Sequence, residues 1–572
     1  QPGTDVMLFH GLLHLMLQNG WTQPGYIAAH TCGFEALQAL VAEHTPERVA
    51  QICGVAEADL HTAARWFATS AATLSLYCQG LNQSSNGTAK NAALINLHLA
   101  TAQIGKPGAG PLSLTGQPNA MGGREVGGMA NLLSAHRDLA NPQHRAEVAA
   151  LWGVPDVPAR PGRTAVEMFQ AAADGEVKAL WIACTNPAQS MPDQTTVRRA
   201  LERAEFVVVQ EAFATAATAD FADLLLPATT WGEKDGTVTN SERRISRVRA
   251  AVAAPGGTRH DWQIALDFAR RLEARLRPGQ PTLFPYETPE QVWLEHREST
   301  RGRDLDITGL TYAMLEEAPR QWPLRPGEDQ GRARLYEDGI FPTADGRARF
   351  ADVAYVPVAE ARESRFPFSL TTGRLRDHWH GMSRTGTLGR LFGHVPEPVV
   401  QMHPQDMARR GLADGDLVHV TSKRGSIVVP AQASAELGLS QAFMAMHWGG
   451  EFLGGQSSQG ERLAGVNQLT TSAYCPTSKQ PELKHAAVKI LKAELPWSLL
   501  AMAWLPDGDA LSVREQLKAL MAQFPFATCV PFGRERAGVL FRAAAYEAPA
   551  PELLARLEAL LGLAGTDTIR YA

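Results

Sequence analysis

The sequence has few cysteines, and none of them are closely paired. Six are scattered over 572 residues, at positions 32, 53, 78, 184, 475 and 529. No Cys-x-x-Cys spacing occurs, so the sequence shows neither a disulfide framework nor the ligand set of an iron–sulfur cluster. Reduced thiols in a cytoplasmic protein are the simplest interpretation.

Long apolar runs and an excess of basic charge are also missing. The longest apolar stretch, near 497–505, is too short to cross a bilayer. The first residues, Gln1 to Val6, have neither the basic start nor the apolar core of a signal peptide. A net charge of −5 argues against nucleic-acid binding. We therefore expect a cytoplasmic protein that binds neither a membrane nor nucleic acid.

The composition is that of a large globular protein. Hydrophobic residues make up 45% and charged residues 20%, which are ordinary values for folded domains. A chain of this length can bury several cores, so we expect several domains.

A glycine-rich stretch at 116–128 is the most informative segment. Five glycines surround the charge pair Arg124–Glu125. Because glycine weakens helices and strands but lets the backbone approach a ligand closely, we predict a loop that passes tightly around a bound group. The guanidinium of Arg124 is suited to an oxyanion. A flexible surface turn is the alternative.

Upstream, the pattern predicts a strand, a polar loop and a helix. Residues 74–78 indicate a short buried strand, 80–87 are polar and glycine-containing, and 88–102 have helical apolar spacing. Polar loops at the carboxyl ends of strands are where α/β sheets bind ligands. The preceding region, about 5–75, has apolar stripes typical of packed helices.

A second unit predicts parallel strands. Strands at 177–184, 205–210 and 223–227 flank a helix at about 193–203, and this order indicates a right-handed βαβ unit. Glu211 follows the middle strand, where a carboxylate suits sugar hydroxyls or a purine edge. A solvated loop carboxylate is the alternative.

Three further segments are less specific. Asp235–Gly236 is a tight-turn signal within a run of alternating charges. Residues from about 275 to 360 are rich in proline, arginine and glutamate and indicate a crossing segment. The tail from about 493 has apolar stripes typical of packed helices, at 511, 513, 517, 520 and at 553, 554, 557, 560.

Short strands at 366–372, 417–421, 426–431 and 442–446 predict a closed β barrel. Its loops at 373–385, 465–470 and 475–480 are unusually polar. His378 and His380 are neighbouring loop histidines, which make a poor zinc set by themselves. We interpret Cys475, which precedes a proline, as structural.

Residues 80–83, the turn at 104–108 and the stretch 116–127 resemble the molybdopterin oxidoreductases of the dimethyl-sulfoxide-reductase superfamily. Within it they are most similar to the assimilatory nitrate reductase catalytic subunits. The resemblance implies an α/β fold, with parallel βαβ (Rossmann-like) cofactor domains and a C-terminal six-stranded double-psi-type β barrel.

The resemblance also implies a domain division. We expect a partial α/β molybdopterin domain at 1–165, a βαβ nucleotide-arm part at 166–275, a crossing segment at 276–365, the barrel at 366–492 and a small helical extension at 493–572. The family's iron–sulfur segment, its molybdenum-ligating cysteine and the two-iron domain common in assimilatory members have no counterpart here. We therefore expect a fragment cut at both ends; a natural variant without the metal ligand is the alternative.

The implied cofactor is molybdenum bis(molybdopterin guanine dinucleotide). No residue of this chain is expected to bind the metal, and an iron–sulfur cluster is expected only in the complete protein. The implied catalytic residue is Arg124, and the implied substrate pocket is Asn119, Met121 and Glu125. The implied cofactor-binding residues are Gly80, Asn82, Gln83, Gly116, Gln117, Gly122, Gly123, Thr185, Asn186, Pro187, Gln210, Glu211, Thr218, Asp235, Arg243, Thr372, Gly373, Arg374, His378, His380, Ser383, Arg384, Thr385, Asn467, Lys479 and Gln480.

The implied reaction is reduction of nitrate to nitrite by oxygen-atom transfer. Electrons would come from a ferredoxin, a flavodoxin or an NADH-linked reductase. A formate dehydrogenase of the same superfamily is the nearest alternative, by analogy of scaffold. A metal-free nucleotide-binding module is an alternative of another class, but no phosphate-binding Gly-Lys-Ser/Thr motif supports it.

Overall fold

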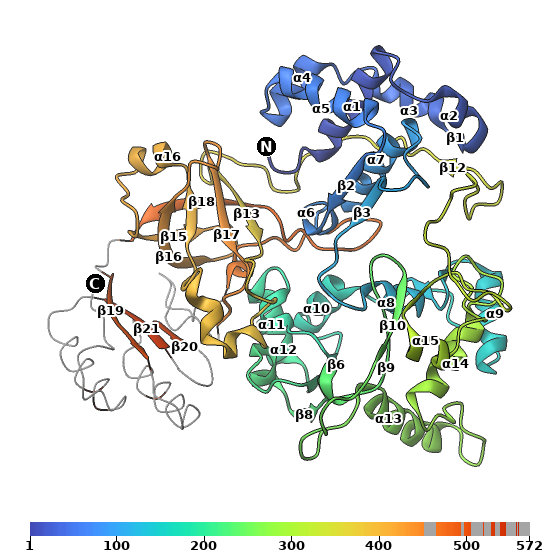
Figure 1. Ribbon diagram of the computed structural model, residues 1–572. Helices are drawn as coiled ribbons and strands as arrows, with labels where there is room; N and C mark the ends of the chain where they lie inside the picture. The colour runs from blue at the N-terminus through green and yellow to red at the C-terminus, as the bar shows by residue number, and fades with distance from the viewer. Residues whose placement is uncertain are drawn as a thin grey trace.

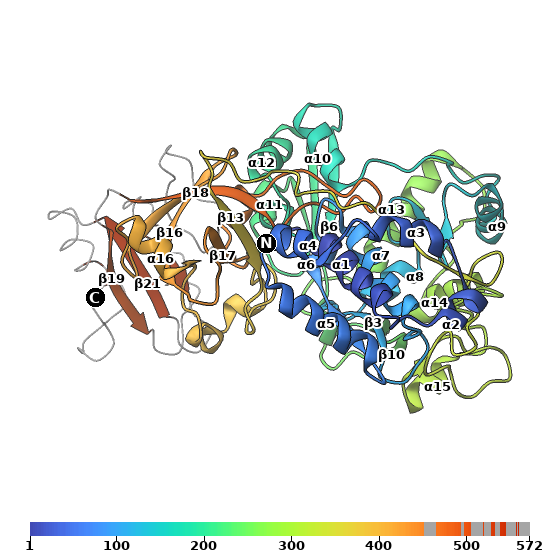
Figure 2. The same ribbon diagram turned by 90° about the horizontal axis from the view of Figure 1, so that it is seen from above.

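In the computed structural model, the described chain forms three bodies (Figure 1), and residues of all three line one cleft. The structure describes residues 1–450, 465–493, 497–504, 519, 528–531, 538–544, 556 and 559. A helical N-terminal module, a lower α/β body and a six-stranded barrel can be followed in both ribbon views (Figure 2). The mixed α/β fold predicted from the sequence is confirmed.

The N-terminal module is mostly helical, as predicted. Its helices are α1 (Asp5–Gln18), α2 (Pro24–His30), α3 (Phe34–Val41), α4 (Pro46–Cys53), α5 (Glu57–Thr69) and α7 (Gly87–Ala100). Leu15, Met16 and Leu37 are almost fully buried and share one core with Leu97 of α7. The apolar stripes of these helices thus meet in a single cluster, which fixes α7 behind the cleft.

The strand expected at 74–78 forms as β2 (Leu74–Tyr77) and pairs in parallel with β3 (Gly110–Ser113). The prediction that it is buried is wrong, because Leu74 and Leu76 are 47% and 57% exposed. Alternate strand residues face opposite sides. Ser75 contacts His98 of α7, with 2.7 Å between its Oγ and the ring Nε2, so the leucines face away from that helix. A short helix, α6 (Gln79–Asn82), follows β2.

The glycine-rich stretch is not only a loop. Residues 120–125 form a short helix, α8 (Ala120–Glu125), which corrects the prediction. Gly122 lies so close to Asn119 that a Cβ there would stand 2.1 Å from the amide oxygen. Tertiary hydrogen bonds of Asn119 and Glu125 hold the turn of helix despite its two glycines. Beyond it come β4 (Leu132–Leu133), β5 (Arg137–Asp138) and α9 (Pro142–Trp152).

The predicted βαβ unit is confirmed. Strands β6 (Ala179–Ala183), β7 (Phe206–Glu211) and β8 (Leu224–Pro227) are parallel neighbours in that order. Their buried side chains, such as Ile182 and Val209, pack in one cluster with residues of α10 (Ala165–Ala173) and α12 (Gln194–Arg203). The short α11 (Pro187–Ser190) starts where β6 has ended.

The next hairpin turns five residues later than expected. Strands β9 (Gly236–Thr239) and β10 (Arg244–Val248) are antiparallel, and β11 (Arg320–Gln321) joins β10. The turn lies at 240–243, where the side-chain oxygen of Asn240 accepts hydrogen bonds from the backbone of Glu242 and Arg244. This Asx-type capping explains why Asp235–Gly236 lies at the start of β9 instead of forming the turn.

The segment after the hairpin forms a packed body before it crosses the molecule. It contains α13 (Asp261–Leu276), α14 (Pro289–Ser299) and α15 (Tyr312–Glu317). Trp293, Leu315 and Trp322 are buried together with Ala135 and Ile245. The chain then returns to the N-terminal module, where β12 (Ala348–Arg349) pairs with β1 (Thr31–Cys32), and continues to the barrel (Figure 1).

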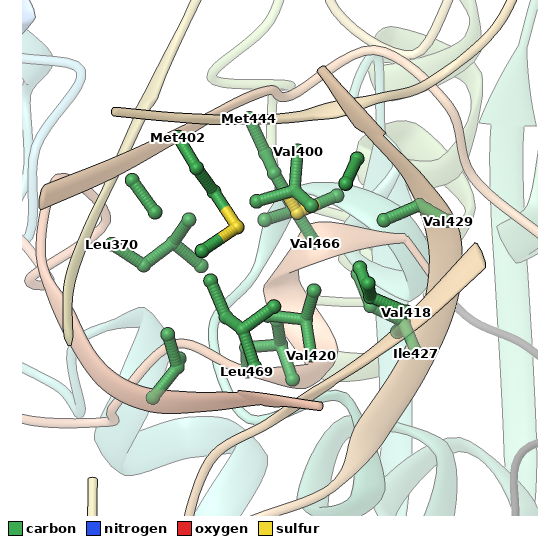
Figure 3. Close-up of a cluster of buried hydrophobic side chains, with 14 of the residues drawn as sticks. Leu370, Val400, Met402, Val418, Val420, Ile427, Val429, Met444, Val466 and Leu469 are labelled. Carbon is green, nitrogen blue, oxygen red and sulfur yellow. The ribbon is translucent and has the colours of Figure 1, made fainter. Parts of the chain in front are cut away.

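The barrel is closed and six-stranded, as predicted. Its strands are β13 (Phe368–Gly373), β14 (Val400–Met402), β15 (Leu417–Thr421), β16 (Ser426–Ala433), β17 (Gln441–Ala445) and β18 (Ala486–Lys492), in the order β13-β17-β14-β16-β15-β18. Alternate side chains such as Leu370, Met402 and Val420 fill its interior (Figure 3). A short helix, α16 (Pro404–Arg409), follows β14. The packed interior leaves ligand binding to the loops at the barrel's rim.

The tail contains strands where helices were expected. Strands β19 (Trp497–Trp504), β20 (Thr528–Pro531) and β21 (Gly538–Ala544) form an antiparallel sheet. The mostly apolar run at 497–504, which was not part of the helical prediction, is typical of a buried strand as well as of a helix. The two stripes on which the helical prediction rested lie outside the described residues. Among the described helices, none is both long enough and apolar enough to span a membrane.

Candidate functional site

A cleft of about 530 Å³ lies between the N-terminal module, the α/β body and the barrel. Predicted residues from both ends of the sequence converge on it. The nine that line it are Gly80, Gln83, Gly116, Gln117, Thr372, Gly373, Arg374, His380 and Asn467. The cleft therefore joins the loop after β2, the loop after β3 and the rim of the barrel.

A half-buried lysine that the sequence reasoning missed gives the cleft a cation. Lys484 lines the cavity, and its Nζ lies 3.4 Å from Thr372 Oγ1 and 3.9 Å from Met446 Sδ. Burial lowers the pKa of Lys484 to about 8. Within the described residues, no carboxylate lies in ion-pair distance of this ammonium. An anion in the cleft would supply that missing partner.

A second lysine in the cleft wall is already paired. Lys90 of α7 is buried, and its Nζ lies 2.8 Å from a carboxylate oxygen of Asp5. Both residues line the cleft. This pair ties α1 to α7, so Lys484 and Arg374, the latter exposed at the mouth, are the cleft's better candidates for anion binding.

The loop after β3 is linked directly to the barrel. The side-chain amide nitrogen of Gln117 lies 3.0 Å from His380 Nε2. Burial, followed by the charges of Arg374, Lys484 and Arg384, lowers the pKa of His380 to about 4. The imidazole is therefore neutral at pH 7, and its Nε2 accepts this hydrogen bond from the Gln117 amide.

Close approach explains two glycines of the site. A Cβ at Gly116 would stand 2.5 Å from a guanidinium nitrogen of Arg374, and one at Gly381 would stand 2.0 Å from the amide oxygen of Gln189. Neither position has room for a side chain without moving a polar group of the cleft. Larger residues would therefore change the shape of the site.

Gln189 holds the barrel against the α/β body. Its side chain, 5% exposed, donates to the carbonyl of His447 at 2.8 Å, and its own carbonyl accepts from the Asn467 amide at 2.8 Å. Gln189 also lines the cleft. It follows the predicted turn 185–187 by two residues, and no sequence signal separated it from its neighbours.

At the carboxyl ends of β6 and β7, the predicted polar residues largely bind one another. The Asn186 side-chain oxygen accepts from the backbone N and Oγ1 of Thr218, at 3.0 and 2.6 Å. The Gln210 side chain accepts from Trp181 and donates to Asp261. Pro187 is buried in the first turn of α11. None of these side chains lines the cleft.

Thr185 and Glu211 lie on the more open side of this edge. Thr185 is exposed, and Glu211 is half-buried with one carboxylate oxygen accepting from two backbone amides of the following turn. Burial raises the pKa of Glu211, whereas the backbone hydrogen bonds and Arg384 act in the opposite direction. Of the polar residues predicted at this edge, Thr185 and Glu211 are the two whose polar groups are not enclosed by the α/β body.

The barrel loop at 374–385 is held by an aromatic side chain. Trp379 lies between the guanidinium groups of Arg374 and Arg384, at 5.2 and 5.6 Å from its ring. His378 is buried, and its Nδ1 lies 3.3 Å from Thr385 Oγ1. Ser383 is half-buried in the same loop. His378, Ser383, Arg384 and Thr385 stand behind the residues that line the cleft.

Several predicted cofactor residues lie elsewhere. Asp235 is exposed, and Arg243 donates to the carbonyls of Trp322, Arg332 and Ala333 while its guanidinium stacks over the Trp322 ring. Asn82 joins Ser113 to Asn91. Lys479 pairs with Glu167, and Gln480 is exposed. The structure does not bring these side chains, or Gly122 and Gly123 of α8, to the cleft wall.

The short helix α8 separates two neighbouring charges. Glu125 is 3% exposed and accepts hydrogen bonds from Thr239 Oγ1 at 2.8 Å and Trp322 Nε1 at 2.5 Å. Burial raises the pKa of this carboxyl group. Asn119 accepts from the backbone of Thr239, and Met121 packs on the same buried cluster. These three residues face into the protein, not into the predicted substrate pocket.

Arg124 faces the other way. Its side chain is exposed and close enough to Tyr77 to lower that phenol's pKa, against the larger upward effect of burial. Tyr77 ends β2 and precedes Cys78, which lines the cleft. Of the four residues predicted to contact substrate, Arg124 is the one that the structure directs toward open space beside the cleft.

Signals for some of the missed residues were present in the sequence. Glu482 and Lys484 come directly after the polar loop that ends at Gln480. Asp5 and Lys90 are adjacent only in space, so spacing in the sequence did not indicate their pairing. The described residues contain no group of three histidine, cysteine, aspartate or glutamate side chains suited to a metal ion.

The family can be assigned from comparison with known proteins. Residues 1–271 match the model of the molybdopterin oxidoreductases, and residues 368–487 match the molydopterin dinucleotide binding domain. The chain belongs to the molybdopterin oxidoreductase family. Because this is a family of enzymes, the metal-free nucleotide-binding module is the wrong alternative.

Among its relatives are nitrate reductases. The chain is 42% identical to the nitrate reductase of Synechocystis sp., over 86% of this chain and 68% of that protein, and 38% identical to that of Klebsiella oxytoca, of which it spans 55%. It is also 33% identical to the F420-dependent formate dehydrogenase subunit alpha of Methanocaldococcus jannaschii, over 68% of that protein. The solved acetylene hydratase from Pelobacter acetylenicus shares the fold, with a TM-score of 0.63 at 16% identity over 86% of this chain and 71% of that one.

Proposed function

We propose that this protein reduces nitrate to nitrite with a molybdenum bis(molybdopterin guanine dinucleotide) cofactor. The observation that carries the proposal is the convergence of residues 80–83, 116–117 and the barrel rim on one cationic cleft. The nitrate reductases among the relatives support the choice of substrate.

The side chains of the cleft fit an anionic, phosphate-bearing group. Lys484 is a half-buried ammonium without a carboxylate at ion-pair distance in the described chain, and Arg374 adds a guanidinium at the mouth. Asn467 and Gln83 add amide groups. These four residues would hold the cofactor, and Thr185 and Glu211 would contact its second nucleotide arm. When bound, the cofactor supplies the metal that takes up the oxygen atom and exchanges electrons.

Arg124 is proposed to bind the nitrate anion. Its guanidinium can hold two oxygens at once, which orients the third toward the reacting centre. The same charge stabilises the negative charge that develops as the N–O bond breaks. The reaction consumes two electrons and two protons for each nitrate and releases nitrite and water.

The test is turnover by the purified holoprotein with a chemical electron donor. We expect nitrite to form at a rate proportional to bound molybdenum. A formate dehydrogenase is the second candidate because of the methanogen relative; it would instead reduce an artificial acceptor when formate is added. Formate oxidation without nitrite formation would contradict the nitrate proposal.

We also propose a cytoplasmic, assimilatory role with a ferredoxin, flavodoxin or NADH-linked reductase as donor. The supporting point is the resemblance of the 80–83 and 116–127 motifs to assimilatory enzymes. Comparing nitrite formation with each reduced donor at equal concentration tests this, and loss of growth on nitrate after gene deletion tests the role. Normal growth on nitrate in the deletion strain would overturn it.

A further inference from the structure

Glu482 is a buried carboxylate at the junction of two walls of the cleft. It lies between the polar loop 475–480 and strand β18, and it is 2% exposed. Its Oε2 accepts hydrogen bonds from Ser84 Oγ at 3.2 Å, Ser85 N at 2.9 Å and Ser85 Oγ at 3.2 Å. Three donors from the N-terminal module therefore converge on one oxygen from the barrel side.

Glu482 lines the cavity together with the residues beside this contact. Leu483 donates its backbone N–H to the carbonyl of Gln83, and the Lys484 N–H donates to Glu482 Oε1 at 3.3 Å. Gln83 and Lys484 both line the cleft. The contact of Glu482 with Ser84 and Ser85 thus holds together the two chain segments that carry these side chains.

The carboxylate is directed away from the nearest cation of the cleft. Lys484 is only two residues away, yet its Nζ contacts Thr372 and Met446 and not Glu482. Had Glu482 paired with Lys484, the cleft would have lost its unpaired positive charge. Charge-assisted hydrogen bonds to Ser84 and Ser85 hold the carboxylate elsewhere and keep the ammonium available.

We propose that Glu482 is a positioning residue that joins the barrel to the α6–α7 turn and sets the cofactor-binding geometry of the cleft. It acts through Gln83 and Lys484 and does not itself touch the reacting atoms. The inference rests on the cofactor part of the proposed function and not on the identity of the substrate.

The experiment measures molybdenum and pterin guanine dinucleotide per chain in purified holoprotein. We expect Glu482→Ala to lower both by about tenfold, since the Ser84 hydroxyl and the N–H and hydroxyl of Ser85 lose this acceptor. Glu482→Gln keeps one carbonyl oxygen and should retain an intermediate content. The paired variant Ser84→Ala/Ser85→Ala keeps the Ser85 N–H donor and should lose part of the content, and adding Glu482→Ala to it should lower the content no further than Glu482→Ala does alone.

Tyr474→Phe is the matched control. Tyr474 lies just before the same loop, but its hydroxyl contacts Glu167, away from the cleft. This variant should lose some thermal stability while keeping its cofactor. A Glu482→Ala content equal to that of Tyr474→Phe would overturn the proposal, as would independent, additive losses from the serines and Glu482.

Two further readouts keep the test decisive. If Glu482→Ala does not fold, Glu482→Gln and the serine pair carry the same comparison, because each removes only part of the contact. Nitrite formation per bound molybdenum is measured alongside. Absence of nitrite in every variant, with the expected pattern of cofactor content, would refute the substrate and leave the role of Glu482 standing.

Discussion

The cleft and the β6–β7 edge both collect polar residues at strand ends, but they use them differently. At the edge, Asn186 and Gln210 hydrogen-bond to neighbours in the same α/β body. In the cleft, Lys484 and Arg374 face a cavity whose opposite wall belongs to another module. Buried polar groups must find partners. A single body supplies them internally, whereas a junction between modules leaves donors for a ligand.

The largest expected effect comes from comparing substitutions of Arg124 and Arg243. We expect Arg124→Ala to lower kcat/KM for nitrate by about 2–4 kcal/mol of transition-state stabilisation, roughly 30- to 1,000-fold, because the guanidinium would bind developing charge. Its thermal stability should hardly change, since the side chain is exposed. Steady-state kinetics with varied nitrate measure the effect.

Arg243→Ala is the control for that variant. Its guanidinium satisfies three backbone carbonyls in the described structure, so its loss should lower the melting temperature and leave kcat/KM per folded molecule close to the parent. Unchanged kinetics in Arg124→Ala would remove Arg124 from the substrate site. Altered kinetics in a folded Arg243→Ala would show that the hairpin β9–β10 reaches the chemistry.

Glu125 tests the inward side of the same short helix. Glu125→Ala should destabilise the protein by about 3 kcal/mol, because Thr239 and Trp322 keep buried donors without an acceptor. Chemical denaturation, monitored by tryptophan fluorescence, measures the loss. Glu125→Gln, which keeps an acceptor oxygen, should lose less. A stability equal to the parent in Glu125→Ala would mean that α8 does not depend on this contact.

The pH response should differ between the two regions. The pKa of Lys484 is lowered to about 8, so the cleft loses positive charge as the pH rises through 8. We expect pyrophosphate binding by cofactor-free protein to weaken by about tenfold for each pH unit above 8, which is about 1.4 kcal/mol. Calorimetric titration between pH 7 and 9.5 measures this.

Lys484→Met should bind pyrophosphate weakly at every pH, and its affinity should change little between pH 7 and 9.5. At the edge, burial raises the pKa of Glu211, so its charge changes on the acid side instead. The direction in which the free energy of unfolding changes with pH follows from proton linkage. Between pH 8 and 10.5 the unfolded chain binds more protons at this lysine, so stability rises with pH there. Binding that stayed constant from pH 7 to 9.5 would exclude Lys484 from the anion site.

Local sequence patterns predicted the elements that depend on local physics. The parallel unit β6-β7-β8 follows from strand and helix periodicity, and the barrel from its short alternating strands. β14 has only three residues, too few for a periodic signal. Helix α8 was missed because glycine disfavours helices, while Asn119 and Glu125 hold it through contacts more than 100 residues away.

The candidate site was predictable where motifs line a loop and not where contacts are tertiary. Gly116, Gln117 and Arg374 were found because their segments are unusual in composition. Lys484 was not, because it follows an ordinary Pro-Glu-Leu sequence, and its importance comes from its place in the cleft wall and from the lack of a carboxylate within ion-pair distance among the described residues. Arg243 was misplaced because an arginine in a charged hairpin gives no sign of the carbonyls it will meet.

Asn186 offers the smallest and most specific test of the comparison. Asn186→Ala removes the acceptor of the Thr218 hydroxyl and backbone amide, so we expect a stability loss of about 1–2 kcal/mol, measured by thermal unfolding. Cofactor content should stay near the parent value, because this side chain makes its hydrogen bonds within the α/β body. Thr185→Ala, on the exposed side of the same turn, should show the reverse: little change in stability and a lower content of guanine nucleotide. Equal loss of cofactor in the two variants would mean that the hydrogen-bonded residues of the β6–β7 edge also bind the cofactor. The contrast between this edge, which pairs its polar groups within one body, and the cleft between modules would then be refuted.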